Sequence, residues 1–240
     1  MTKLPDTFER FARRILPANL SADLRSRFQH LGQHYELGSE AALEFSEPGQ
    51  HLVFVAQGAT KLIAHASQSR DQIVAFHFSG DVLTVPSAEN YPYSLAALLE
   101  TRLLAFPAEA FLQLAAGEAG ILGRLLESSS VSLRRCREKA IAIGRKTATE
   151  RVAVFLLAMA ERIGSPAPGG AVLLNLPMSR RDIAESLGLT IETVSRQFTL
   201  LRDARAICTS GRAEVTLLDL AKLQERAGYL SEARSLFWRI

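Results

Sequence analysis

Three side chains near the C-terminal end have the types and the spacing of a base-reading surface. Glu192, Ser195 and Arg196 stand at positions i, i+3 and i+4, so they share one face of any helix that contains them. Arginine donates two parallel hydrogen bonds to guanine O6 and N7, and glutamate accepts from the cytosine amino group. Serine contacts either a thymine methyl group or a phosphate. The three side chains therefore predict contacts in the major groove of double-stranded DNA.

The segment that carries them, Met178–Ala204, is predicted to form two short helices joined by a tight turn. Ser179 can cap the first helix, with Asp182 three residues on as in a capping box. Gly188 can take the positive φ that ends this helix, and Thr190 can cap the second helix. The second helix has an apolar stripe at helical spacing, made of Val194, Phe198 and Leu201. This pattern is typical of a helix-turn-helix, and the alternative is an ordinary helical hairpin with a charged outer face.

The predicted DNA contacts lie on the outer face of the second helix and at the starts of both helices. They are Glu192, Ser195, Arg196, Ser179, Arg180, Thr190, Thr193 and Thr199. Basic residues also cluster in the middle of the chain, where they could contact phosphates or form a solvated helix face. That cluster is Arg134, Arg135, Arg137, Lys139, Arg145, Lys146 and Arg151.

A seam of small and apolar side chains precedes this region, on a long helix expected from about Glu118 to Ile143. Its members repeat with the a/d spacing of a coiled coil. They are Leu122, Leu126, Ser129, Leu133, Cys136, Ala140 and Ile143. Such a seam needs a partner, and the simplest one is the same helix of a second copy in a parallel homodimer. The alternative is that the helix packs on the β-domain of its own chain.

The rest of the pattern predicts an α+β protein whose N-terminal part is an antiparallel sandwich or a jelly roll (the β-roll). Short apolar or alternating runs between Ala41 and Phe106 are divided by turn residues such as Gly49, Gly58 and Gly80. A hairpin around Ser210-Gly211 would form the wing of the helix-turn-helix. The expected parts are a helical segment (1–36), the β-roll (37–117), the dimerisation helix (118–144), the winged helix-turn-helix domain (145–228) and a tail (229–240).

Composition excludes several other classes of protein. The formal net charge of +3 permits nucleic-acid binding, and two cysteines in 240 residues exclude a disulfide framework. No phosphate-binding loop, Ser-His-Asp order or HExxH pair occurs, so no enzyme is expected. No apolar run has the length of a membrane span and the N-terminus lacks a signal-peptide core, so we expect a cytoplasmic protein without a membrane partner.

The order of β-roll, long helix and winged helix-turn-helix resembles the Crp–Fnr family, that of the cyclic-AMP receptor protein and the fumarate–nitrate reduction regulator. Thr190–Arg196 (TIETVSR) is similar to the recognition helix of its FixK-type branch, and Phe76–Asp81 and Ala97–Pro107 are similar to that branch's β-roll. The resemblance implies a homodimeric transcription regulator that reads a palindromic TTGA-type site through Glu192, Ser195 and Arg196. It also implies RNA polymerase as a partner.

The chain departs from this family where its members bind their signals. Cyclic-nucleotide binders of the family hold the phosphate with Gly-Glu and a later Arg-Ser or Arg-Thr, but this chain has Gly80-Asp81 and then Tyr93-Ser94. Cyclic AMP is therefore not expected to bind. Oxygen sensors of the family carry N-terminal cysteines for an iron–sulfur cluster, whereas the first cysteine here is Cys136. We expect no cofactor.

The resemblance to the FixK-type branch favours no ligand at all, with activity set by the level of the protein. Two alternatives for a controlling signal stay open. The β-roll could bind haem, through His51, His65 or His77, or another small ligand. Oxidation of Cys208 in the wing or of Cys136 in the seam could instead control DNA binding.

Overall fold

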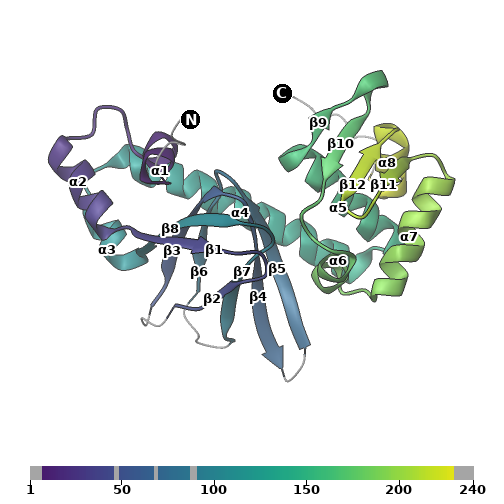
Figure 1. Ribbon diagram of the computed structural model, residues 1–240, viewed down its shortest axis with the longest axis horizontal. Coiled ribbons are helices and arrows are strands. Elements are labelled where there is room, and N and C mark those ends of the chain that lie inside the picture. Colours follow the sequence, from purple (N-terminus) through teal and green to yellow (C-terminus); the bar gives the residue numbers. More distant parts are fainter. Residues whose placement is uncertain (1–6, 46–48, 68–69, 87–90, 230–240) are drawn as a thin grey trace. The chain divides into compact units, whose positions relative to one another are not determined.

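The structure is a computed structural model of the chain, and it describes residues 7–45, 49–67, 70–86 and 91–229 (Figure 1). The chain divides into two compact units between Cys136 and Arg137, within the long helix α4 (Ala119–Arg145). Helices accompany antiparallel sheets in both units, which confirms the predicted α+β class.

The first unit contains the predicted antiparallel β-roll. Its strands form two four-stranded sheets, in the orders β1-β8-β3-β6 and β2-β7-β4-β5. The first sheet consists of β1 (Gln33–Leu37), β8 (Thr101–Pro107), β3 (His51–Gln57) and β6 (Val82–Val85). The second sheet consists of β2 (Ala42–Leu43), β7 (Tyr93–Ala97), β4 (Ala59–Ser67) and β5 (Arg70–Phe78).

Strand β3 is buried on both faces, because two hydrophobic clusters enclose it. Successive side chains of a strand point to opposite faces. Val53 and Val55 belong to the cluster that fills the roll, whereas Leu52 and Phe54 belong to the cluster beneath the helices. The strand His51–Gln57 therefore carries a continuous apolar run, Leu52–Ala56, with no alternation of polar and apolar residues.

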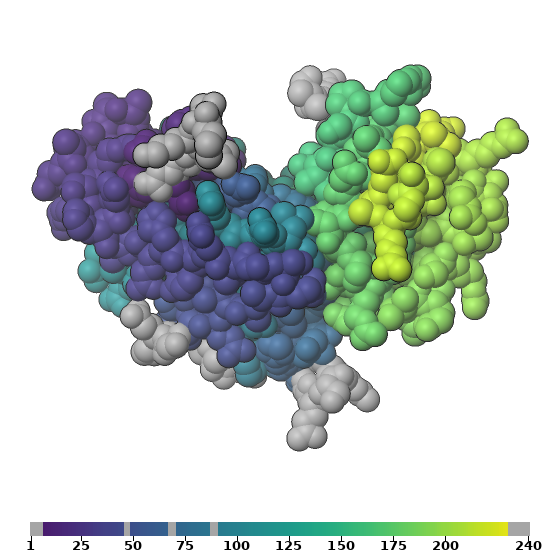
Figure 2. All heavy atoms as spheres, in the orientation of Figure 1, coloured from purple at the N-terminus to yellow at the C-terminus, as the bar shows by residue number. Residues whose placement is uncertain are grey.

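The cluster beneath the helices is called the outer cluster. It contains side chains of three helices, α1 (Thr7–Ile15), α2 (Ala22–Leu31) and α3 (Ala108–Ala115). Helix α1 contacts β3 and β8, and α2 contacts α3. Phenylalanine rings join these elements, with centroids 4.8 Å apart for Phe11 and Phe106 and 5.0 Å apart for Phe28 and Phe111. In the space-filling view, the purple residues of α1 and α2 cover one end of the unit (Figure 2).

The N-terminal segment differs from the prediction at its end, because helix does not continue to residue 36. Gly32 ends α2 in an extended conformation, and β1 begins at Gln33. Tyr35 and Leu37 alternate along β1 and pack against the cluster inside the roll. The segment forms a strand because these two side chains pack against residues that are distant in the sequence.

The second unit holds the remaining elements in the predicted order (Figure 1). Its helices are α5 (Ala148–Ile163), α6 (Arg180–Leu187), α7 (Ile191–Asp203) and α8 (Leu220–Arg226). Its sheet has the order β11-β12-β10-β9. The strands are β9 (Ser165–Pro166), β10 (Val172–Asn175), β11 (Ile207–Ser210) and β12 (Glu214–Leu217), and a 3-10 turn, η1 (Pro168–Gly170), separates the first two. Strands β11 and β12 form the predicted wing, in which Gly211 has a φ of 61°.

Within the described ranges, every helix is too short or too polar to cross a membrane. Residues 1–6 and all of the predicted tail except Tyr229 lie outside these ranges.

Candidate nucleic-acid interface

Helix α6 begins with the predicted capping box. The Ser179 hydroxyl oxygen accepts a hydrogen bond from the Asp182 amide at 3.1 Å. In return, the Asp182 carboxylate accepts from the Ser179 amide at 2.7 Å and from the Ser179 hydroxyl at 2.6 Å. The helix ends at Gly188, whose φ of 63° lies in the left-handed region that glycine adopts without strain. Both ends of the first helix are thus fixed by local interactions.

Helix α7 is fixed by its own cap and by its apolar side. The Thr190 Oγ1 atom accepts a hydrogen bond from the Thr193 amide at 3.2 Å. Val194, Phe198 and Leu201 are buried on the inner side of the helix, as their spacing predicts. Two helices with a glycine turn between them therefore form the expected helix-turn-helix.

The outer side of α7 brings four predicted contacts together. Glu192, Ser195, Arg196 and Thr199 are all exposed. A hydrogen bond from its own backbone amide, followed by one from the Thr190 side chain, holds the pKa of the Glu192 carboxyl below its ordinary value. Glu192 is therefore ionised at neutral pH and acts only as a hydrogen-bond acceptor, which suits the cytosine amino group.

Three further predicted contacts lie at the starts of the two helices. Ser179 and Thr190 are exposed caps, and the Thr190 and Thr193 hydroxyl oxygens lie 3.1 Å apart. Helix N-termini attract phosphate through their free N–H groups and the helix dipole. The direct role of these hydroxyl groups in DNA binding stays a prediction.

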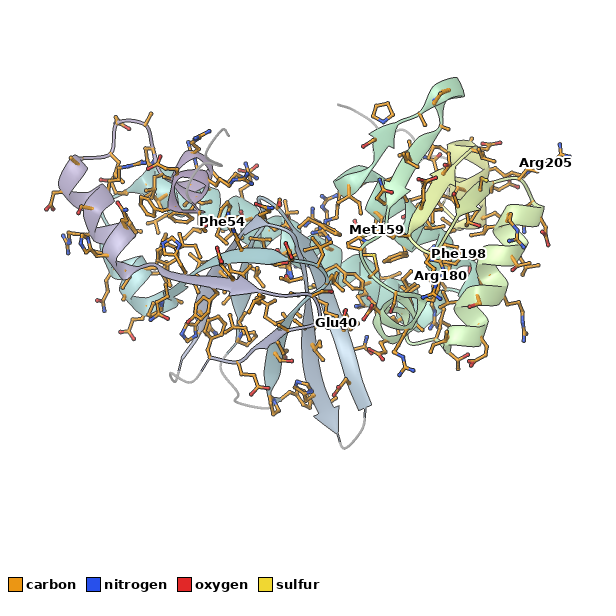
Figure 3. All side chains as sticks on the ribbon, in the orientation of Figure 1. Glu40, Phe54, Met159, Arg180, Phe198 and Arg205 are labelled. Atoms are coloured by element: carbon orange, nitrogen blue, oxygen red, sulfur yellow. The ribbon has the colours of Figure 1, made fainter. Side chains whose placement is uncertain are left out.

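Arg180 occupies a more enclosed position than the other predicted contacts. Its guanidinium carbon lies 3.5 Å from the centroid of the Phe198 ring, and the two side chains point toward each other in Figure 3. Burial lowers the pKa of this guanidinium, and its Nη1 atom is buried without a hydrogen-bond partner among the described residues. Arg180 thus joins α6 to α7 through a cation–π contact. Its contact with DNA stays a prediction.

Part of the basic cluster is engaged inside the second unit. Lys139 donates to the Ser186 hydroxyl at 2.9 Å, and Lys146 donates to the Ala227 carbonyl at 2.6 Å. Arg151 donates to three backbone carbonyls. The sequence did not indicate these roles, because the bonds to Ser186, Ala227 and Leu187 join segments that are far apart along the chain.

The two cysteines and the three histidines of the alternative signals lie on five different helices and strands. Both thiols are exposed, Cys136 on α4 and Cys208 on β11. The His51 ring stacks on Phe45, with centroids 4.0 Å apart. His65 lies 2.8 Å from the Asp71 carboxylate through Nδ1 and 2.9 Å from the Ser94 hydroxyl through Nε2. In the ranges that the structure covers, no three His, Cys, Asp or Glu side chains gather as metal ligands would.

Comparison with known proteins decides the family. The Crp-like helix-turn-helix domain matches residues 150–226, and the cyclic nucleotide-binding domain matches residues 38–118. The nitrogen fixation regulation protein FixK of Bradyrhizobium diazoefficiens is 34% identical over 209 residues, which are 86% of this chain and 86% of that protein. The chain belongs to the Crp–Fnr family. Its members regulate transcription, and this Crp–Fnr chain carries their helix-turn-helix DNA-binding domain.

Two further relatives of this Crp–Fnr chain support the same assignment. The transcriptional activator protein FnrL of Cereibacter sphaeroides is 31% identical over 186 residues, which are 75% of each chain. The solved structure of FixK2 from Bradyrhizobium japonicum has a TM-score of 0.71 and 30% sequence identity, and the match covers 83% of this chain and 99% of that one. The predicted resemblance to the FixK-type branch is thereby confirmed.

Proposed function

We propose that the chain is a homodimeric transcription regulator that reads a palindromic TTGA-type DNA site, with one α7 helix in each half-site. The observation that carries this proposal is the exposed face of α7. Glu192, Ser195 and Arg196 present an acceptor, a hydroxyl and a bidentate donor side by side on a helix that is capped and packed from behind. This is the chemistry that direct readout in the major groove requires.

The middle of α4 supports the homodimer. Leu126 is 69% exposed and Leu133 is 50% exposed, although both are large apolar side chains. The neighbouring seam residues Ser129, Cys136 and Ala140 are exposed as well. A second α4 would remove this face from water, as in a two-stranded coiled coil.

The two ends of the seam contribute less to such an interface. Leu122 packs against the outer cluster of the first unit, and this cluster includes the fully buried Ile121. Ile143 is half-buried, and a Cβ at Gly188 would lie 4.0 Å from its side chain. The proposed interface is therefore centred on residues 126–140. The start of α4 instead packs within its own first unit, as the alternative to a coiled coil predicts for the helix.

The β-roll supports regulation without cyclic AMP. The buried Ser94 hydroxyl, which the family resemblance places beside a cyclic phosphate, lies 2.9 Å from His65 Nε2. Tyr93, in the place of the phosphate-binding arginine, packs against the cluster that fills the roll. That cluster consists of Val53, Val55, Leu62, Leu83, Val85, Leu95, Leu103 and Ala105.

The proposal extends to the partners of the dimer. A DNA-bound regulator of this family would act on RNA polymerase, in the cytoplasm where the bacterial chromosome lies. We infer that the chain activates transcription, because the relative FnrL is a transcriptional activator protein.

Selection of binding sites from random double-stranded DNA tests the proposal. We expect the protein to recover a palindrome of two TTGA-type half-sites with one fixed spacing. Recovery of single half-sites, or of no common sequence, would contradict it. Parallel selections with protein prepared with and without air would show whether oxygen or thiol oxidation controls DNA binding, because the recovery of the site would then differ between the two preparations.

A further inference from the structure

Arg151, near the start of α5, ties together the ends of two other helices. Its Nη2 atom donates to the Ile143 carbonyl at 2.6 Å, and its Nε atom donates to the Lys146 carbonyl at 2.9 Å. Its Nη1 atom donates to the Leu187 carbonyl at 3.2 Å. Ile143 lies in the last turn of α4, Lys146 directly follows that helix, and Leu187 is the last residue of α6.

These carbonyls need an external donor. The last four carbonyls of a helix lack an intrahelical partner, and the helix dipole makes that end negative. A planar guanidinium with donors on both sides satisfies several such groups at once, which an ammonium group cannot do in a fixed geometry. Arg151 therefore links the direction of the last turn of α4 to the position of α6.

Neighbouring contacts extend this link to the reading helix. The Thr149 hydroxyl donates to Gln197 Oε1 at 2.6 Å, and Gln197 is a buried residue of α7. A Cβ at Gly188, in the turn between α6 and α7, would lie 3.9 Å from Arg151 Nη1. The first turn of α5 thus holds the end of α4 and both helices of the helix-turn-helix.

We propose that Arg151 is a positioning residue for DNA recognition. It fixes the angle between the end of α4 and the helix-turn-helix, and so sets the separation of the two α7 helices in the dimer. This inference rests on the proposed function, because it requires two copies joined along α4 and bound to two half-sites. The half-sites of such dimers lie about 34–36 Å apart, one turn of DNA, so a change of angle at the junction misplaces one reading helix.

The test is the affinity for a series of palindromes whose half-sites are separated by different numbers of base pairs. We expect the wild-type dimer to show one sharp optimum. For Arg151→Gln we expect about tenfold weaker binding at that optimum, the scale of one lost charged hydrogen bond, and a broader or shifted optimum. A site with one half-site scrambled should bind wild type and variant alike, because the face of α7 is unchanged.

Arg145→Gln provides the matched control. Arg145 is an exposed residue in the last turn of α4, so this variant loses the same charge close to the same place. It should lower affinity by the same factor at every spacing and make the salt dependence shallower, as a lost phosphate contact does. The conservative variant Arg151→Lys should restore part of the sharp optimum.

The outcomes separate the inference from the proposed function. A uniform loss of affinity for Arg151→Gln at all spacings, or a spacing optimum like that of wild type, would overturn the positioning role. If circular dichroism shows that Arg151→Gln does not fold, Arg151→Lys takes its place. A spacing optimum broader than that of wild type then supports the positioning role, and an optimum as sharp as that of wild type overturns it. If wild type itself shows no preference for a palindrome, the proposed function fails, and the positioning role fails with it before any variant is compared.

Discussion

At the scale of single residues, the proposed function depends on three exposed side chains of α7. Glu192, Ser195 and Arg196 are exposed, whereas Val194 and Phe198 on the inner side of the same helix are buried. The caps at Ser179 and Thr190 fix the helices that carry these residues. Readout then depends on the chemistry of each side chain, since the backbone is held independently of them.

Arg196→Ala should weaken binding to the preferred site by about 1–3 kcal/mol and relax selectivity at one base pair, as expected for a bidentate contact to guanine. Gel-shift titrations against all four bases at each position of the half-site would measure both effects. Arg202→Ala is the control, because Arg202 is exposed on the same helix outside the reading trio. An equal loss for all sequences in the Arg196 variant would make that residue a phosphate contact.

At the scale of elements, α4 combines two kinds of packing. Its start is buried against the first unit through Ile121, whereas its middle exposes Leu126 and Leu133. The a/d spacing alone could not separate these two parts, because the same apolar residues suit both a coiled coil and a packed helix.

Leu126→Lys should dissociate the dimer and weaken binding to a palindrome, because it places a charge in the centre of the proposed seam. Light scattering would report the mass and gel-shift titration the affinity. Ile141→Lys is the matched control, since Ile141 is 59% exposed on α4 but lies off the a/d positions. A Leu126 variant that stays dimeric, or an Ile141 variant that dissociates, would place the interface elsewhere.

The connection between β3 and β4 requires a glycine. Gly58 has a φ of 93°, and a Cβ there would collide with Thr101 and with the Glu100 carbonyl. Gly58→Ala should therefore lower the free energy of unfolding by about 1–2 kcal/mol or more. Thermal unfolding followed by circular dichroism would measure the change. Gly117→Ala should leave the melting temperature nearly unchanged, because Gly117 has no atom within 4 Å of its Cβ position; an equal loss in both variants would argue against the steric cause.

At the scale of the whole molecule, a β-roll, a long helix and a winged helix-turn-helix occur in one chain of the Crp–Fnr family. The β-roll of this chain is filled by its own side chains, and Ser94 lies within hydrogen-bond distance of His65. This packing and this contact support the proposal that the chain regulates transcription without cyclic AMP.

We expect purified protein to bind its DNA site with equal affinity with and without added cyclic AMP, and to show no Soret absorbance band. The physical reason is that Tyr93 offers no guanidinium for a cyclic phosphate, while His51 and His65 are engaged by Phe45 and by Asp71 and Ser94. Absorbance spectra and DNA titrations would check this. A Soret band or a response to the nucleotide would restore the effector-sensing alternative.

The sequence by itself determined the features that depend on neighbouring residues. The capping box at Ser179, the glycine turn at Gly188 and the spacing of Glu192 and Arg196 are local, so the helix-turn-helix and the exposed outer face of its second helix could be predicted from residue types alone. The family could be predicted from the resemblance of TIETVSR to the FixK-type branch, because this motif is also one continuous segment of the sequence.

Only the tertiary structure decided the features that join distant segments. It turned the segment after Gly32 into a strand, because Tyr35 and Leu37 pack, partly buried, against the cluster inside the roll. It placed Arg180 on Phe198 and gave Arg151 three carbonyls from α4, its flanking residue and α6. A basic residue looks the same in sequence whether it contacts phosphate or a helix end, and the fold decides which acceptor lies within reach.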